Sequence, residues 1–199
     1  MKKILAISGS YRDGGITDQI IERFEHAAHK AGIQMEIIAL RDVPIEFCTN
    51  CRNCTQEPGT TPGKCVLNDN MGDLVQKIEE ADGYIFASPT NMYSVTALFR
   101  RFLERLVVFG YWPWDMNAPK FRKDGGVRKK AVLVSSCAAP GIMGRIFYDT
   151  MKPLKRAAKL VGADSVGSLF VGLISKDKSP VLTEQYNRKI DSLVKKLVA

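Results

Sequence analysis

The chain has 199 residues, of which 45% are hydrophobic and 25% charged, and its formal net charge at pH 7 is +8. These proportions are typical of a soluble globular protein. No stretch approaches the roughly 18 apolar residues of a membrane span. The first apolar run, residues 4–7, is also shorter than the roughly 7–15 residues of a signal peptide. We therefore expect a cytoplasmic protein with no membrane partner.

The excess of lysine and arginine allows three kinds of anionic partner: nucleic acid, an anionic cofactor or an acidic protein. The basic segments "KPLKRAAK", "FRKDGGVRKK" and "KKLVA" lie far apart in the chain and contain no base-stacking pattern of aromatic residues. Scattered lysines on solvated helix faces explain such a distribution. The sequence therefore predicts no nucleic-acid partner.

Five short apolar runs alternate along the chain with longer segments of helical periodicity. The runs expected to be strands are residues 3–8, 35–40, 83–88, 129–136 and 165–174. Their nearly continuous apolar character is typical of strands buried on both faces of a parallel sheet. Apolar stripes between and after the runs predict helices at about 20–31, 74–81, 98–107 and 186–197.

A further helix is expected at about 143–161, although Pro153 would break a hydrogen bond inside it. Repeated β-α units with right-handed crossovers predict an α/β fold, with a doubly wound parallel sheet covered by helices on both faces. We expect residues 1–199 to form a single domain. The longest irregular segments are 41–68 and 109–128, and long loops on such a scaffold usually carry function.

Ligands of such sheets bind beyond the carboxyl ends of the strands, where three loops of this chain should meet. The first loop, "SGSYRDGGIT" (8–17), lacks the glycine patterns of dinucleotide and triphosphate sites. Ser10, Arg12 and Thr17 are side-chain donors, and two glycines free the backbone before a helix starts. This combination is typical of a phosphate site. An ordinary turn with Thr17 as the helix N-cap would explain it equally well.

The second and third loops supply different chemistry. "SPTNMYS" (88–94) adds a proline turn with polar and aromatic side chains, although it could simply precede a helix capped by Ser94 or Thr96. "SSCAAPG" (135–141) consists of small residues, against which a flat ring could lie. Because all three loops should share one edge, together they favour a binding site over three ordinary turns.

At this point the sequence resembles a known family. "GSYRDGGIT", "DNMGDLVQKIEEADGYIFASP" and "SVTALFRRFLER" look like the flavodoxin-like NAD(P)H-dependent FMN reductases, over residues 1 to about 141. With its cysteines included, the chain is similar to the iron–sulfur flavoprotein branch of that family. The resemblance implies a five-stranded parallel sheet of order 2-1-3-4-5, with FMN at its carboxyl edge.

The resemblance also implies which residues contact FMN. The phosphate would bind to Ser10, Arg12 and Thr17, next to Ile16, where the family often has asparagine. The residues expected to line the isoalloxazine ring are Pro89, Thr90, Asn91, Met92 and Tyr93, with Ser136, Cys137 and Ala138 bordering it from the fourth strand. The family often has tyrosine at the position of Asn91. Both departures change contacts without removing the site.

Four of the five cysteines are clustered. "FCTNCRNC" places Cys48, Cys51 and Cys54 at a spacing of C-x₂-C-x₂-C, and Cys65 follows. A structural disulfide is disfavoured in a reducing compartment, and zinc more often binds two separated C-x₂-C pairs. Three close thiolates with a fourth farther away are typical of a [4Fe–4S] cluster. The spacer before Cys65 is longer than is usual in this branch, so Cys137 is a competing fourth ligand.

Three functions follow from these features. The first is an iron–sulfur flavoprotein that transfers electrons between a low-potential donor and FMN. The alternatives are an NAD(P)H-dependent FMN or quinone reductase without a cluster, and a non-enzymatic flavin-binding module. In each enzymatic case the flavin carries the chemistry, so no catalytic side chain is required. The donor or acceptor would be a small molecule, with NAD(P)H as one candidate, or a protein such as an acidic ferredoxin.

The aromatic segment "VVFGYWPWDM" (107–116) bears on assembly. Phe109, Tyr111, Trp112 and Trp114 could fold back as core or as a lid over the flavin. Aromatic clusters are also enriched at protein interfaces, and flavoproteins of the resembled family are usually dimers or tetramers. We therefore expect a homodimer or homotetramer with this segment at a subunit contact.

Overall fold

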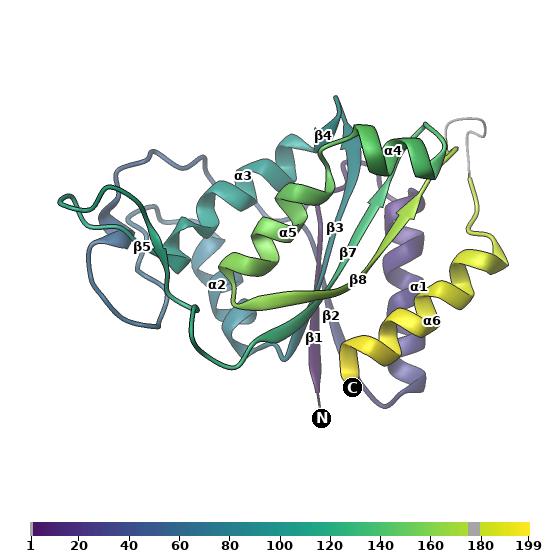
Figure 1. Cartoon of the computed structure of the whole chain (residues 1–199), viewed down its shortest axis with the longest axis horizontal. Coiled ribbons are helices and arrows are strands. Elements are labelled where there is room, and N and C mark those ends of the chain that lie inside the picture. Colours follow the sequence, from purple (N-terminus) through teal and green to yellow (C-terminus); the bar gives the residue numbers. More distant parts are fainter. Residues whose placement is uncertain (1, 175–179) are drawn as a thin grey trace.

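The computed structural model describes residues 2–174 and 180–199. Five parallel strands form its central sheet in the order β2-β1-β3-β7-β8 (Figure 1). Their bounds are β1 Lys3–Ser8, β2 Gln34–Ala39, β3 Gly83–Asn91, β7 Lys129–Ser136 and β8 Ala163–Val171. The predicted strands and the order 2-1-3-4-5 are therefore confirmed. One short strand, β4 (Ser94–Val95), pairs antiparallel with the end of β3.

Helices cover both faces of the sheet (Figure 1). Their bounds are α1 Ile16–Lys30, α2 Met71–Glu80, α3 Ala97–Arg105, α4 Gly141–Phe147, α5 Met151–Leu160 and α6 Glu184–Val198. Alternate strand residues point to opposite faces, so Leu5 and Ile7 pack with α2, α3 and α5, whereas Ile4 and Ala6 pack with α1 and α6. Burial on both faces explains why the strands read as continuous apolar runs.

The helix expected at about 143–161 is two helices in the structure. Tyr148–Thr150 separate α4 from α5, and Pro153 is the third residue of α5. In the first turn of a helix the backbone N–H has no intrahelical acceptor, so proline breaks no bond there. The N-cap of α1 is Gly15 rather than Thr17. Thr96 does cap α3, accepting a hydrogen bond of 3.2 Å from the N–H of Phe99.

The two long irregular segments contain little regular structure. Residues 41–68 include only the short 3-10 helix η1 (Asn53–Thr55). After α3, the 3-10 helix η2 (Leu106–Phe109) leads into a small hairpin of β5 (Gly110–Tyr111) and β6 (Lys120–Phe121). Both segments lie on the same side of the molecule, left of the sheet in Figure 1.

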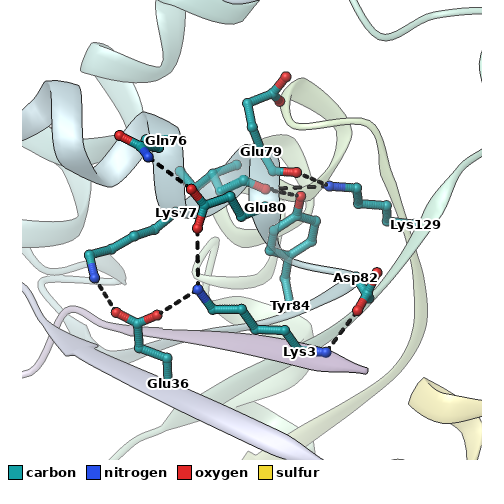
Figure 2. A network of polar contacts seen from close by, with 10 residues as sticks. Lys3, Glu36, Gln76, Lys77, Glu79, Glu80, Asp82, Tyr84 and Lys129 are labelled. Atoms are coloured by element: carbon teal, nitrogen blue, oxygen red, sulfur yellow. Dashed lines mark hydrogen bonds and ion pairs between the residues drawn. The ribbon is translucent and has the colours of Figure 1, made fainter. Parts of the chain in front are cut away.

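A network of charged residues fixes α2 to the amino edge of the sheet (Figure 2). Glu36 of β2 pairs with Lys77 of α2 and with Lys3 of β1, the latter at 3.2 Å. The ammonium of Lys129 donates to the carbonyl of Glu79 at 2.8 Å, near the carboxyl end of α2. This edge lies opposite the predicted ligand site, so the network acts on stability rather than on binding. Among the residues that the structure describes, no helix is long and apolar enough to cross a membrane.

Candidate functional site

The loop between β1 and α1 is shaped to leave backbone donors free. Gly9 touches the start of α3 so closely that a Cβ would lie 2.7 Å from the Cβ of Phe99. The Ser10 hydroxyl then accepts from the N–H of Arg12 at 3.2 Å, which closes a tight turn. Gly14 has a φ of +63°, and Gly15 begins α1 without any side-chain cap. The first N–H groups of α1 therefore remain available to an anion.

Arg12 is the free cation of this loop. Its side chain is exposed, and among the described residues it has no ion pair. Arg41 behaves differently, because it pairs with Asp13 at 2.8 Å and with Asp18 at 3.0 Å. Asp13 of the loop and Asp18 of α1 thus both pair with Arg41, and neither pairs with Arg12, which lies beside the free N–H groups. An anionic ligand is the chemistry that this arrangement suits.

The ends of β3 and β7 form the second and third walls. The Thr90 hydroxyl lies 2.8 Å from that of Thr150 and 3.3 Å from that of Ser135. The Thr17 hydroxyl lies 3.3 Å from that of Ser136, which joins the first loop to the third. These contacts hold three chain segments, far apart in sequence, around one edge.

Together the walls enclose a cleft of about 700 Å³, a size common for small-molecule sites. All the predicted FMN contacts line it except Met92 and Tyr93. Those two form the tip of the β3–β4 hairpin with positive φ, and their exposed fractions are 90% and 66%. The lining residues that sequence analysis missed are Tyr11, Gly15 and Ile174. Ile174 follows β8, and only the sheet order brings it to this edge.

Cys137 belongs to the cleft and not to the cysteine loop. Its N–H donates to the carbonyl of Val171 at 2.8 Å, and its thiol donates to the carbonyl of Ala139 at 3.2 Å. Burial raises the pKa of this thiol. The cavity lined by the four clustered cysteines does not include Cys137.

Cys48, Cys51, Cys54 and Cys65 line one small cavity. Asn50 and Arg52, which flank Cys51, have φ values of +55° and +60°. Left-handed residues within a loop turn successive N–H groups inward, as in backbone concavities that bind anions and iron–sulfur clusters. Hydrogen bonds from the N–H of Asn53 and the hydroxyl of Thr49 lower the pKa of Cys51. The loop thus offers hydrogen-bond donors to the Cys51 thiolate.

The four sulfurs also influence one another. Burial, followed by the negative charges of Cys65, Cys48 and Cys51, raises the pKa of the Cys54 thiol to about 11. Among the described residues, no group of three His, Cys, Asp or Glu side chains has the geometry to hold a single metal ion. In a cluster each thiolate binds a different iron, so its four ligands stand farther apart than the ligands of one ion.

The long spacer between Cys54 and Cys65 folds back onto the cysteine loop. Gly63 lies against the Cys54 carbonyl, and its N–H donates to the carbonyl of Val108 at 2.8 Å. Arg122, only 6% exposed, donates to the carbonyls of both Cys54 and Gly59 at 3.2 Å. These contacts return Cys65 to the cavity despite the length of the spacer.

Arginines that sequence analysis did not single out surround the cysteines. Arg52 lies between two rings, 3.9 Å from the centroid of Trp112 and 4.4 Å from that of Trp114. Its guanidinium donates to the carbonyl of Trp112 at 2.6 Å. Phe109 is fully buried in the core. Phe109 therefore belongs to the core and Trp112 holds Arg52, whereas Trp114 stays exposed, and the subunit contact of this segment stays a prediction.

The cleft and the cysteine cavity lie at opposite ends of α3. Thr96, at the start of the helix, donates to the carbonyl of Gly9 at 2.6 Å beside the cleft. Arg105, its last residue, and Val107 and Val108 beyond it line the cysteine cavity. The helix has nine residues and is therefore about 14 Å long. The cysteine loop therefore leaves the carboxyl edge of the sheet before it reaches the four cysteines, and the two sites have separate lining residues.

The order of the sheet and the cleft at its carboxyl edge define a flavodoxin-like α/β protein. Residues 2–161 match the model of the NADPH-dependent FMN reductase family, and the chain belongs to this family. It resembles in fold the FMN-dependent NADH-azoreductase of Bacillus anthracis, solved in complex with FMN, with a TM-score of 0.70 at 12% identity over 100% of both chains.

Several curated relatives that the chain matches carry the name iron–sulfur flavoprotein. One, from Methanocaldococcus jannaschii, is 33% identical over 103 residues, which is 52% of this chain and 51% of that protein. Another, from Archaeoglobus fulgidus, is 30% identical over 111 residues, covering 56% of this chain and 48% of the relative. The chain thus spans about half the length of the curated relatives that it matches.

Proposed function

We propose that the chain is a flavin-dependent oxidoreductase that binds FMN in the cleft and a [4Fe–4S] cluster on Cys48, Cys51, Cys54 and Cys65. The observation that carries the proposal is the gathering of these four cysteines, without Cys137, around one cavity. FMN would supply two-electron and one-electron chemistry, and the cluster one-electron chemistry. The protein supplies position, charge and exclusion of water.

In this proposal Arg12, Ser10 and the first N–H groups of α1 hold the FMN phosphate. Pro89, Thr90 and Asn91 lie along one side of the ring, and the backbone from Ser136 to Ala138 lies along another. The hydroxyls of Thr90 and Thr150 hold each other at 2.8 Å, which fixes the loop after β3. Rigid walls of this kind position a ring without any side chain taking part in proton transfer.

We further propose that the chain acts as a homo-oligomer. Exposed apolar side chains gather beside the cleft, on the hairpin tip and on α4: Met92, Tyr93, Met143, Ile146 and Phe147. The two elements are joined, since the N–H of Asp149 donates to the carbonyl of Tyr93 at 2.8 Å. A second copy covering this surface would exclude water from the cleft. The second copy could also bring its cysteine loop close to this cleft. Within one chain, the cleft and the cysteine loop are separated by the length of α3.

The proposed protein partner is an acidic electron carrier such as a ferredoxin. A groove of about 440 Å³ runs between α3 and α5, and the cations that line it are Arg100, Lys152, Lys155, Arg156 and Lys159. Its one carboxylate, Asp149, pairs with Lys152 at 2.9 Å. Complementary charge would accelerate docking, and salt would slow it. Electron transfer from a reduced ferredoxin to Lys155→Glu/Arg156→Glu protein should be slower, and the wild-type rate should fall with ionic strength.

The decisive experiment is analysis of protein purified without oxygen. About four iron and four sulfide per chain, one FMN, and an absorption shoulder that dithionite bleaches would support the proposal. Cys51→Ala should lose the cluster while retaining FMN, whereas Cys137→Ala should retain the cluster. Zinc in place of iron, or a full cluster in Cys51→Ala protein, would overturn the cluster assignment.

Membership of the NADPH-dependent FMN reductase family favours a second function, hydride transfer from NAD(P)H to FMN without a cluster. Protein that binds FMN but contains no iron and oxidises NAD(P)H rapidly would establish it. FMN binding without any oxidation of NAD(P)H and without iron would leave only a non-enzymatic flavin-binding module.

A further inference from the structure

We propose that Arg105, locked in place by Asp69, raises the reduction potential of the cysteine-bound cluster through a hydrogen bond to the Cys65 sulfur. The inference rests on the proposed function, because it concerns the same cavity. It assigns a redox role to the buried ion pair between Arg105 and Asp69.

The position of Arg105 is fixed from both sides of its guanidinium. The residue ends α3, and its side chain is 1% exposed. Nη1 and Nη2 donate to the two carboxylate oxygens of Asp69 at 2.5 and 3.0 Å, a two-pronged geometry that allows one orientation. Nη1 also donates to the carbonyl of Glu46 at 2.8 Å. Asp69 is held in turn by the N–H groups of Glu46 and Met71.

This orientation directs a remaining donor at a proposed ligand. Nη2 of Arg105 lies 3.5 Å from Sγ of Cys65, within the range of a hydrogen bond to sulfur. Nε of Arg105 is buried and has no acceptor among the described residues, and the same holds for Nε of Arg52. Both arginines line the cysteine cavity. Buried donors without acceptors are costly, and an anionic group in the cavity would offer these two an acceptor.

The direction of the effect follows from charge. Asp69 neutralises the net charge of Arg105. The Cys65 sulfur therefore interacts chiefly with the dipole of an Arg105 N–H group. A reduced cluster carries one more negative charge than an oxidised one, and its sulfurs are stronger acceptors. A hydrogen bond to the ligand sulfur therefore stabilises the reduced form and raises the potential.

A merely structural role makes a different prediction. If Arg105 serves only to join Glu46 to Asp69, substitutions will lower stability and iron content, and the remaining cluster will keep its potential. If Arg105 tunes the cluster, two substitutions should move the potential in opposite directions. Arg105→Lys keeps the charge but loses the fixed fork, so the bond to Cys65 weakens and the potential falls. Asp69→Asn leaves the guanidinium uncompensated beside Cys65, so the potential rises.

The experiment is a dithionite titration of anaerobic holoprotein followed by electron paramagnetic resonance, with iron counted in each sample. We expect the equilibrium constant for one-electron reduction to fall about tenfold in Arg105→Lys, or 59 mV, and to rise in Asp69→Asn. Arg23→Lys is the matched control, because its ion pair with Asp191 lies on the opposite face of the sheet. That control should keep the wild-type potential.

The possible failures are distinct. Wild-type protein without iron or sulfide would overturn the proposed function and this inference with it. A wild-type cluster whose potential is the same in Arg105→Lys and Asp69→Asn, at full iron content, would overturn this inference alone. If either variant fails to fold, the double variant Arg105→Met/Asp69→Asn removes the buried charges together, and its potential should fall as that of Arg105→Lys does. An unchanged potential there would also contradict the proposal.

Discussion

Gly63 and Cys54 are in direct backbone contact, although eight residues separate them: a Cβ on Gly63 would overlap the carbonyl oxygen of Cys54. We predict that Gly63→Ala forces the spacer away from the cysteine loop and displaces Cys65. The expected result is a loss of about 1–3 kcal/mol of unfolding free energy, together with incomplete iron binding. Denaturant unfolding and iron analysis measure both.

A second glycine supplies the control. Gly72 lies in α2, and a Cβ there would meet no atom within 4 Å. Gly72→Ala should leave iron binding unchanged and stabilise the helix by up to about 1 kcal/mol. Equal behaviour of the two alanine variants would show that the contact between Gly63 and Cys54 is not needed to hold Cys65.

Arg12 provides the test of the proposed phosphate site. Its guanidinium has no ion pair among the described residues, so a phosphate would be its first anionic partner. Arg12→Ala should weaken FMN binding by about 1.5–3 kcal/mol, which is roughly a 10- to 150-fold rise in Kd. Flavin fluorescence quenching measures the affinity. Arg128→Ala removes the same charge at the opposite edge of the sheet, beside Ala163, and should bind FMN normally. Unchanged affinity in Arg12→Ala would exclude this residue from the phosphate site.

The sequence was sufficient to predict the sheet and the loops that meet at its edge. Continuous apolar runs have a strong physical cause, since strands buried on both faces tolerate few polar residues. The polar and small residues that follow these runs had to lie at the carboxyl edge once the strands were parallel. That is why Ser10, Thr90 and Ser136 line one cleft.

What the sequence did not predict depends on contacts between distant segments. Arg105 and Arg122 look like surface residues of a basic chain, yet both are buried because carbonyls and a carboxylate from other loops surround them. The break between α4 and α5 was also missed. Pro153 was placed inside one long helix, whereas it lies in the first turn of a second helix. Neither the burial of these arginines nor the break between the helices changes the local hydrophobic periodicity of the sequence.

The ion pairs of Glu36 should make stability depend on pH. The hydrogen bond from Lys77, and then that from Lys3, holds the pKa of Glu36 below its usual value of 4.5, although burial opposes the shift (Figure 2). A carboxylate with a lowered pKa in the folded state stabilises the protein above about pH 4.5. This contribution is lost as the pH falls through the lower, folded-state pKa.

We therefore predict that Glu36→Gln costs about 0.5–1 kcal/mol at pH 7 and progressively less below pH 4.5. Urea unfolding of wild type and variant between pH 3 and pH 7 measures the difference. Glu184→Gln, in the first turn of α6 and outside this network, should not show the same convergence at low pH. A difference for Glu36→Gln that stays constant down to pH 3 would mean that the ion pairs contribute nothing.

The last prediction concerns assembly. Met92 and Phe147 are 90% and 70% exposed, and they lie on two joined elements beside the cleft. If a second copy covers them, the double variant Met92→Glu/Phe147→Glu buries two like charges at the contact. Its dissociation constant should rise at least tenfold, or about 1.4 kcal/mol, and light scattering at micromolar concentration should detect monomers. Val127→Glu, at a fully exposed position on the opposite edge, should assemble as the wild type does. A monomeric wild type would contradict the proposal of a homo-oligomer. An unchanged mass of the double variant would show that the subunit contact lies elsewhere on the molecule.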